Sequence, residues 1–264
     1  MSTLKSLLVA LLAVSCSAAA FAQEFTSELN CDSRWMGRRD SAVHCEIRDL
    51  NLAATDRLMV DGGGSGSIRV SGWDRNEVSV RTQVVAWGRD DAAAREAVDG
   101  IVIRADGVLR AEGPRRDRRG ASVSFEIRAP RGTDLHIRAV NGSVAIAEIA
   151  GELDVATTNG RITLGEVTDT VAARSTNGAI DVTLSAQPFV GESLDVATTN
   201  GAITLNIRER FSAQLDVRTV NGGIRVDGPV NVAGRARNWL DATLGEGEVP
   251  AKIRSTNGSV RVRQ

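Results

Sequence analysis

The octapeptide LDVATTNG occurs at residues 153–160 and again, unchanged, at residues 194–201. Its closing Asn-Gly pair belongs to a longer series, in which successive copies are separated by 18, 18, 23, 21 and 36 residues, so that the last interval is twice the first. A recurring interval is typical of proteins built from stacked structural repeats. The asparagines of the series are Asn141, Asn159, Asn177, Asn200, Asn221 and Asn257.

All copies share one hydrophobic frame, which the first octapeptide illustrates. Apolar Val155 lies four positions before the Asn, small Thr157 lies two positions before it, and apolar Ile162 and Leu164 follow it by three and five positions. This alternation predicts one strand on each side of Asn-Gly, each with a single buried face. The chain should bend between the two strands, and we expect Gly to adopt a positive φ there and Asn to tolerate the left-handed region.

Two architectures fit this frame. In the first, Asn-Gly closes β-hairpins, and the units form an antiparallel meander with Val155 opposite Leu164. In the second, each unit is one coil of a parallel β-solenoid, equivalent residues stack about 4.8 Å apart, and the six Asn side chains form a hydrogen-bonded ladder. The row three positions before the Asn favours the solenoid, because Arg and Ala alternate in it and like charges are kept apart. That row reads Arg138, Ala156, Arg174, Ala197, Arg218 and Arg254.

Further elements are predicted outside the six units. Residues 90–100 begin with Asp, contain good helix formers and end in Gly, which predicts one short helix. Residues 101–113 read as strand, Asp-Gly turn and strand. Residues 66–70 resemble residues 258–262, which predicts a related strand early in the chain. Residues 222–257 are two units long, and we expect them to contain a further coil with a degenerate turn.

The N-terminal segment has the features of an export signal. Residues 1–22 contain Lys5, an apolar stretch too short to span a bilayer, and small residues before a predicted cleavage site after Ala22. Lipid anchoring at Cys16 is the less favoured alternative. We therefore predict an exported protein in the periplasm or on the cell surface, with no membrane span.

Export also decides the interpretation of the two cysteines that remain after cleavage. In an oxidising compartment Cys31 and Cys45 are expected to form one disulfide. The predicted domain organisation is a signal peptide (1–22), a disulfide-closed segment (23–54) and a β-solenoid (55–264).

The order of several segments resembles that of a known family. SGWDRNEVSV (71–80), SFEIRAPRGTDLHIRAVNGSV (124–144), the serial TTNGxI units and LGEGEVPAKIRSTNGSVRV (244–262) are similar to the exported bacterial putative-adhesin family of unknown function. The resemblance covers roughly residues 55–264. It implies a right-handed parallel β-helix and carries over no catalytic residues. Together with the repeat frame, we predict a solenoid of about seven coils with a β-rich N-terminal portion and one short helix.

Sequence features of a cofactor, metal or nucleic-acid site are lacking. The only histidines are His44 and His136, and the cysteines are assigned to the disulfide, so no metal-ligand set is predicted. The DGGGSG segment (61–66) lacks the glycine spacing of a phosphate-binding loop and precedes a strand. The formal net charge of −1 provides no overall field toward nucleic acid.

Two further functions are considered and disfavoured. Asp195 and Asp216, five positions before their Asn, are expected on neighbouring coils, and paired carboxylates suit a polysaccharide-acting enzyme. Flanking Arg174 and Arg218 favour surface ion pairs instead. A Thr row directly before the Asn fits ice binding, but charged residues such as Arg161 interrupt the neighbouring rows. We predict that the protein is not an enzyme.

The favoured function is that of a non-catalytic, adhesin-like structural or interaction module of the cell envelope, whose partner is an envelope polymer or an envelope protein. The alternative is a binding module for anionic envelope polymers. Arg261 and Arg263 are expected to protect the open edge of the last coil. The candidate polyanion-binding residues are Arg115, Arg116, Arg118 and Arg119 in a basic loop, and Arg138, Arg174, Arg218 and Arg254 in the repeat.

Overall fold

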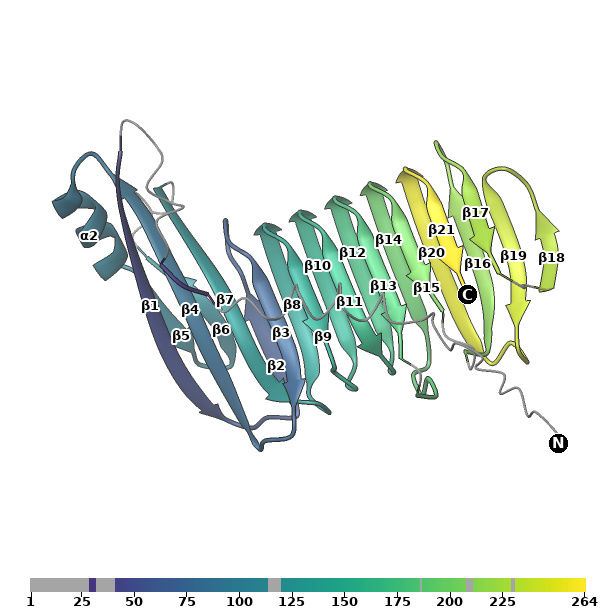
Figure 1. Ribbon diagram of the computed structural model, residues 1–264, viewed down its shortest axis with the longest axis horizontal. Coiled ribbons are helices and arrows are strands. Elements are labelled where there is room, and N and C mark those ends of the chain that lie inside the picture. Colours follow the sequence, from purple (N-terminus) through teal and green to yellow (C-terminus); the bar gives the residue numbers. More distant parts are fainter. Residues whose placement is uncertain (1–28, 32–40, 114–119, 186, 208–210, 229–230) are drawn as a thin grey trace, which may run out of the picture.

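The protein is built from two long β-sheets that enclose one hydrophobic core. The computed structural model describes residues 29–31, 41–113, 120–185, 187–207, 211–228 and 231–264. Within them lie a ten-stranded sheet, called sheet A, and an eleven-stranded sheet, called sheet B. Figure 1 shows the strands stacked in one elongated row, with the single described helix at the end formed by β1 and β4.

The spatial order of the strands in each sheet differs from their order in the chain. From one edge to the other, sheet A consists of β1 (Ala42–Ala53), β4 (Glu77–Gly88), β7 (Ala121–Pro130), β3 (Ile68–Trp73), β9 (Val144–Ala147), β11 (Ile162–Val167), β13 (Ile180–Leu184), β15 (Ile203–Asn206), β21 (Val260–Arg263) and β17 (Ile224–Asp227). Sheet B consists of β18 (Asn231–Arg235), β19 (Trp239–Leu244), β16 (Ala213–Thr219), β20 (Val249–Asn257), β14 (Leu194–Asn200), β12 (Val171–Asn177), β10 (Leu153–Asn159), β8 (Asp134–Asn141), β2 (Arg57–Asp61), β6 (Val108–Glu112) and β5 (Val102–Ala105).

The repeat units are stacked parallel coils. Each Asn-Gly corner joins a strand of sheet B to a strand of sheet A, and Val155 pairs in parallel with Ile137 and Ala173. Leu164, in the other sheet, pairs with Ile146 and Val182. The alternative of an antiparallel meander, with Val155 opposite Leu164, is therefore wrong, and the prediction of stacked parallel units is confirmed. The predicted apolar positions are buried because they point between the two sheets.

The last coil of the chain is inserted into the stack. β20 pairs with β14 on one side and with β16 on the other, and β21 lies between β15 and β17. In Figure 1 the yellow C-terminal strands accordingly lie between the green β14/β15 coil and the β16/β17 coil. The edge of sheet A at this end is β17, so the expectation that Arg261 and Arg263 protect an open edge is wrong.

The segment before this insertion is a hairpin and not a coil. β19 runs antiparallel to β16, and β18 runs antiparallel to β19, so that sheet B extends beyond the last coil. The expectation of a degenerate coil within residues 222–257 is therefore wrong. The interval of 36 residues between Asn221 and Asn257 arises because the chain first forms this hairpin and then returns to form a coil between β14 and β16.

The N-terminal end of the stack also departs from chain order. β3 lies between β7 and β9, and β2 lies between β6 and β8, which confirms an early strand related to the repeat. β4 pairs antiparallel with β7, and β1 pairs antiparallel with β4 along its whole length, so residues 42–53 belong to sheet A. The predicted helix is α2 (Asp91–Asp99), with Asp90 as its N-cap and Gly100 as its C-cap, and β5 and β6 form the predicted hairpin.

The Asn-Gly glycines are required for a reason that differs from the predicted one. The described glycines with positive φ are Gly63, Gly66, Gly107, Gly228, Gly245 and Gly247, and none of them follows an Asn of the series. Instead, a Cβ on Gly160 would lie 1.9 Å from the Gly142 carbonyl oxygen, and one on Gly178 would lie 1.8 Å from that of Gly160. The backbone of one coil thus occupies the space that a side chain of the next would need.

This contact generates a stability prediction. Gly178→Ala should destabilise the fold by more than about 3 kcal/mol, because two adjacent coils must separate to admit the Cβ. Gly132→Ala, where a Cβ meets nothing within 4 Å, is the matched control and should change stability by less than about 0.5 kcal/mol. Urea unfolding followed by circular dichroism measures both values. Similar small losses in the two variants would contradict the close-approach explanation.

Candidate functional site

A continuous ladder of asparagine amides runs along one edge of the stack. Asn141 donates from Nδ2 to the Gly64 carbonyl oxygen at 2.7 Å, and each further Nδ2 donates to the Oδ1 of the Asn on the adjacent coil. The ladder follows spatial order, so that Asn257 stands between Asn200 and Asn221. The Nδ2–Oδ1 distances are 2.7 Å for Asn159–Asn141, Asn177–Asn159, Asn200–Asn177 and Asn257–Asn200, and 2.8 Å for Asn221–Asn257.

A second ladder, formed by side chains two residues before each Asn, was not predicted from the sequence. The small residue two positions before the Asn donates its hydroxyl to the carbonyl oxygen of the Asn-Gly glycine on the adjacent coil; Thr198, for example, bonds Gly178 at 2.9 Å. These hydroxyl groups belong to residues only 4–6% exposed, so each buried polar group is satisfied. The sequence signal for this ladder is the hydroxyl group itself, since Thr or Ser occupies this position in every unit except that of Asn141. The donors are Thr157, Ser175, Thr198, Thr219 and Ser255.

The outer face of sheet B carries ion pairs that reach from one coil to the next. Arg138 bonds Asp154 through Nη2–Oδ2 at 2.7 Å and Nη1–Oδ1 at 3.1 Å, and His136 Nδ1 lies 2.9 Å from the same carboxylate. Arg174 Nη2 bonds Asp195 Oδ2 at 2.7 Å. In both cases the carboxylate belongs to a copy of LDVATTNG, and an Ala of that copy stands beside the Arg of the neighbouring strand.

The prediction that Asp195 and Asp216 lie on neighbouring coils is wrong. Asp195 and Asp216 are not neighbours, because Lys252 on the inserted strand β20 pairs with both positions. Asp216 forms an ion pair with Arg254, and Arg218 Nε lies 2.8 Å from Asp216 Oδ1. The two carboxylates proposed for a polysaccharide-acting enzyme are therefore separated by a cation. No group of three or more metal-ligating side chains is found in the described part of the chain.

One carboxylate of this face has a displaced pKa. Partial burial raises the pKa of Asp154, but the hydrogen bond from Arg138 and the charges of Arg138, His136 and Arg174 outweigh burial, so the pKa lies below its ordinary value of 3.8. Asp154 is therefore ionised at neutral pH, as a structural partner of Arg138 should be.

A groove of about 510 Å³ lies on this face of sheet B. Arg138, Arg174 and Arg254 line it, together with Ala156 and Ala197 from the same row. Hydroxyl side chains complete the lining on the side toward the Asn ladder; they include Thr158, Thr176, Thr199 and Thr256. Three of the four predicted repeat arginines thus line the same groove. The fourth, Arg218, pairs with Asp216 and Asp241 instead. Arg115, Arg116, Arg118 and Arg119 lie outside the described residues.

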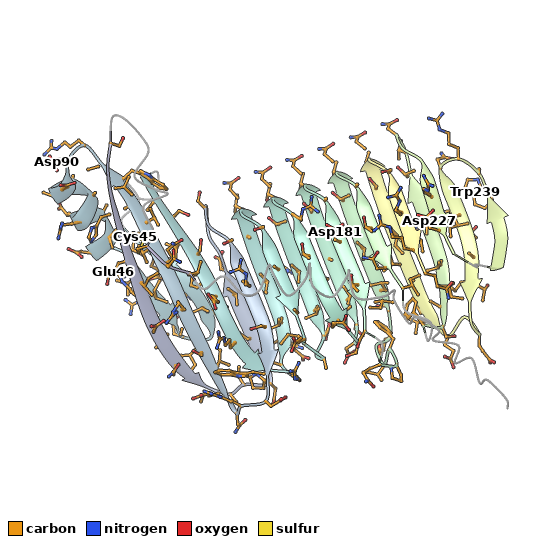
Figure 2. The ribbon with its side chains drawn as sticks, in the orientation of Figure 1. Cys45, Glu46, Asp90, Asp181, Asp227 and Trp239 are labelled. Atoms are coloured by element: carbon orange, nitrogen blue, oxygen red, sulfur yellow. A yellow bond between two sulfur atoms is a disulfide. The ribbon has the colours of Figure 1, made fainter. Side chains whose placement is uncertain are left out.

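The disulfide fastens an N-terminal segment to the other sheet. Cys31 and Cys45 are bonded, with their Cα atoms 5.7 Å apart, and Cys45 lies on β1 near α2 (Figure 2). Beside it, Leu29 N donates to Glu126 Oε2 at 2.9 Å, and Gln83 Nε2 donates to the Asn30 carbonyl oxygen. Residues 29–31 therefore lie against β4 and β7 of sheet A.

Arg48 joins β1 to the C-terminal end of the helix. Its guanidinium donates to the carbonyl oxygens of Val98, at 3.0 Å, and Ile101, and bonds Glu46 at 2.8 Å. The hydrogen bond from Arg48 holds the pKa of Glu46 below its ordinary value. A cation is the favoured partner for the carbonyl groups that end a helix, so this contact explains how α2 is held at the end of the stack.

A family model described as Toastrack DUF4097 matches residues 63–263, which span the strands from β3 to β21. The chain belongs to the Toastrack DUF4097 family. The family is one of unknown function, and it agrees with the resemblance noted in the sequence. A comparison with curated proteins finds no match. No helix in the described ranges is long and apolar enough to cross a membrane.

Solved structures similar to this Toastrack chain are distant in sequence. A putative cell adhesion protein from Clostridium sporogenes ATCC 15579 is 11% identical with a TM-score of 0.42, and the match covers 84% of this chain and 100% of that one. A putative adhesin from Bacteroides fragilis NCTC 9343 is 15% identical with a TM-score of 0.42, covering 83% and 96%. A putative lipid binding protein from Parabacteroides distasonis ATCC 8503 is 12% identical with a TM-score of 0.28, covering 83% and 96%.

The Asn ladder predicts a difference between its interior and its end. Asn177→Ala removes two ladder hydrogen bonds and Asn221→Ala removes one, so the losses of unfolding free energy should be about 2 and about 1 kcal/mol respectively. Urea unfolding of the two variants, made in the same background, measures the ratio. An interior loss no larger than the terminal one would show that the amides do not stabilise the stack as a ladder.

The lowered pKa of Asp154 predicts a pH dependence. Because this pKa is lower in the folded state than in the unfolded state, the stabilisation is present above pH 3.8 and is lost as pH falls through the folded-state pKa. Asp154→Asn should therefore cost about 1 kcal/mol at pH 7 and progressively less below pH 4. Asp106→Asn is the control, because its ion pair with Arg110 lies at an exposed hairpin turn and should contribute little to stability. Unfolding curves at several pH values supply the comparison, and a cost that does not change with pH would contradict this assignment.

Proposed function

We propose that this protein is a non-catalytic, adhesin-like structural and interaction module of the cell envelope. The observation that carries the proposal is the pair of uninterrupted ladders, one of amides and one of buried hydroxyl groups, which join every Asn-Gly coil to its neighbours. Ladders of this kind hold the coils at a fixed spacing, and a stack of fixed spacing presents a long, rigid surface, which is the common use of solenoids.

The charged side chains of sheet B support a non-catalytic role. Asp154, Asp195 and Asp216 are each engaged by arginine across a coil boundary, which is how structural ion pairs are arranged. A general acid in a glycosidase needs a raised pKa, whereas the pKa of Asp154 is lowered.

Export, winding and domain division belong to the same proposal. The disulfide suits an oxidising compartment, so we place the mature protein in the periplasm or at the cell surface after removal of residues 1–22. Right-handed winding follows the general rule for parallel strand connections, and we infer about seven coils within residues 55–264, preceded by the disulfide-closed segment 23–54.

The second candidate function is binding of an anionic envelope polymer. The observation that favours it is the groove in which Arg138, Arg174 and Arg254 meet. Guanidinium groups are well suited to carboxylate and phosphate, and such binding depends on salt because it is electrostatic.

One experiment tests the proposed function. Oxidised mature protein, residues 23–264, is mixed with purified envelope fractions and sedimented at low and at high salt, and envelope proteins near it are crosslinked in intact cells. Co-sedimentation that salt abolishes supports polymer binding, and a specific crosslinked envelope protein supports an adhesin-like protein interaction. If the folded protein neither sediments with envelope nor crosslinks to an envelope component, the proposed function is wrong.

A further inference from the structure

The three arginines of the groove are evenly spaced. They lie on β8, β12 and β20, and one strand separates each from the next, namely β10 with Ala156 and β14 with Ala197. Neighbouring strands are about 4.8 Å apart, so the guanidinium groups recur about every 9.5 Å along the stack. In chain order the third arginine would be Arg218; because the last coil of the chain is inserted next to β14, Arg254 takes that place.

The same insertion completes a row of hydroxyl groups. In spatial order the row before the Asn reads Val140, Thr158, Thr176, Thr199, Thr256 and Val220. The four threonines are exposed, occupy consecutive strands and line the groove beside the arginines. The two valines are the end members of the row. One line of hydrogen-bonding hydroxyl groups, one per strand, thus runs parallel to a line of cations, one per two strands.

The central arginine of the groove retains donors for a ligand. A guanidinium has five N–H donors. Arg174, at the centre of the groove, makes a single hydrogen bond to Asp195, and its side chain is 53% exposed. The carboxylate holds the guanidinium in place and leaves its remaining N–H groups accessible, so Arg174 is oriented before any ligand arrives.

We propose that the groove binds a linear acidic polysaccharide lying along the stack, with one anionic group on every second sugar. This inference rests on the second candidate function and specifies its ligand. A polymer rich in hydroxyl groups matches the Thr row, and a charge that recurs once per disaccharide matches arginines on every second strand. Single-stranded nucleic acid fits less well, because its phosphates recur too closely and the groove-lining residues include no aromatic side chain for base stacking.

The ion pairs also provide selectivity against a more highly charged chain. Asp154 and Asp195 lie on β10 and β14, the strands between the arginines. A polymer with a carboxylate on every sugar would bring alternate charges close to these aspartates, whereas a polymer with a carboxylate on every second sugar avoids them. Repulsion of the wrong ligand therefore adds to attraction of the right one.

The test compares three oligosaccharide probes of equal length. Hyaluronan fragments carry a carboxylate on every second sugar, polygalacturonate fragments carry one on every sugar, and chitin fragments are neutral. Binding to oxidised mature protein is measured by calorimetry at low salt. We expect the hyaluronan fragments to bind most tightly, and Arg174→Gln to weaken that binding about tenfold or more, as for a lost hydrogen bond to a charged group.

The matched control is Arg225→Gln, which breaks a similar Arg–Asp pair, with Asp227, on sheet A (Figure 2 labels Asp227). Its binding should equal that of the wild type, and the unfolding midpoints of both variants should stay close to the wild-type value. Equal affinity for the two acidic probes would overturn the spacing argument and leave general polyanion binding standing. No binding of any probe by folded protein would overturn the groove proposal, while envelope co-sedimentation or crosslinking still decides the proposed function.

Discussion

The close approach of backbones at the Asn-Gly corners is the constraint on which the stack depends. The carbonyl oxygen of one glycine lies where the Cβ of the next coil's residue would be, as at Gly160 and Gly178. Only with glycine there can the coils come near enough for the amide of Asn177 to reach Asn159 and for the hydroxyl of Ser175 to reach Gly160. The corner therefore sets the distance between coils, and the two ladders and the parallel strand pairs follow from that distance.

A single corner type also explains how the chain can depart from its own order. Every Asn-Gly unit presents the same amide and the same apolar positions, and every unit except the first, which has Ala139 there, presents the same hydroxyl. A unit can therefore stack on one that is not its neighbour in the chain. β20 can therefore pair with β14 and β16 as readily as consecutive strands pair elsewhere. The hairpin of β18 and β19 supplies the length of chain that the return requires, and it covers β16 at the end of sheet B.

This interchangeability marks the boundary of what the sequence could predict. Alternation around Asn159 and its equivalents placed the strands and the buried faces, the Arg–Ala row favoured parallel stacking over hairpins, and local capping signals placed α2. Spatial order was not predictable, because a repeat frame identifies equivalent residues without saying which copies touch. For that reason Asp195 and Asp216 were expected side by side, although Lys252 separates them. The hydroxyl ladder was missed for a different reason: Thr and Ser at a buried position suit a strand whether or not they find an acceptor.

The repeated octapeptide can now be understood through its neighbours. Both copies, on β10 and on β14, lie between strands that carry arginine, and in both the Asp accepts one of those arginines while the Ala fills the row between them. Identical surroundings require identical residues, so the repetition reflects a local pattern of one cation per two strands. Between β8 and β20 that pattern keeps the arginines apart and gives the groove a periodic positive charge. Beyond the groove Arg254 and Arg218 are direct neighbours, and both bond Asp216. Stability and recognition therefore both require a small, uncharged residue at Ala156 and Ala197. A larger or charged side chain at either position would disturb the neighbouring ion pairs and would also fill the groove.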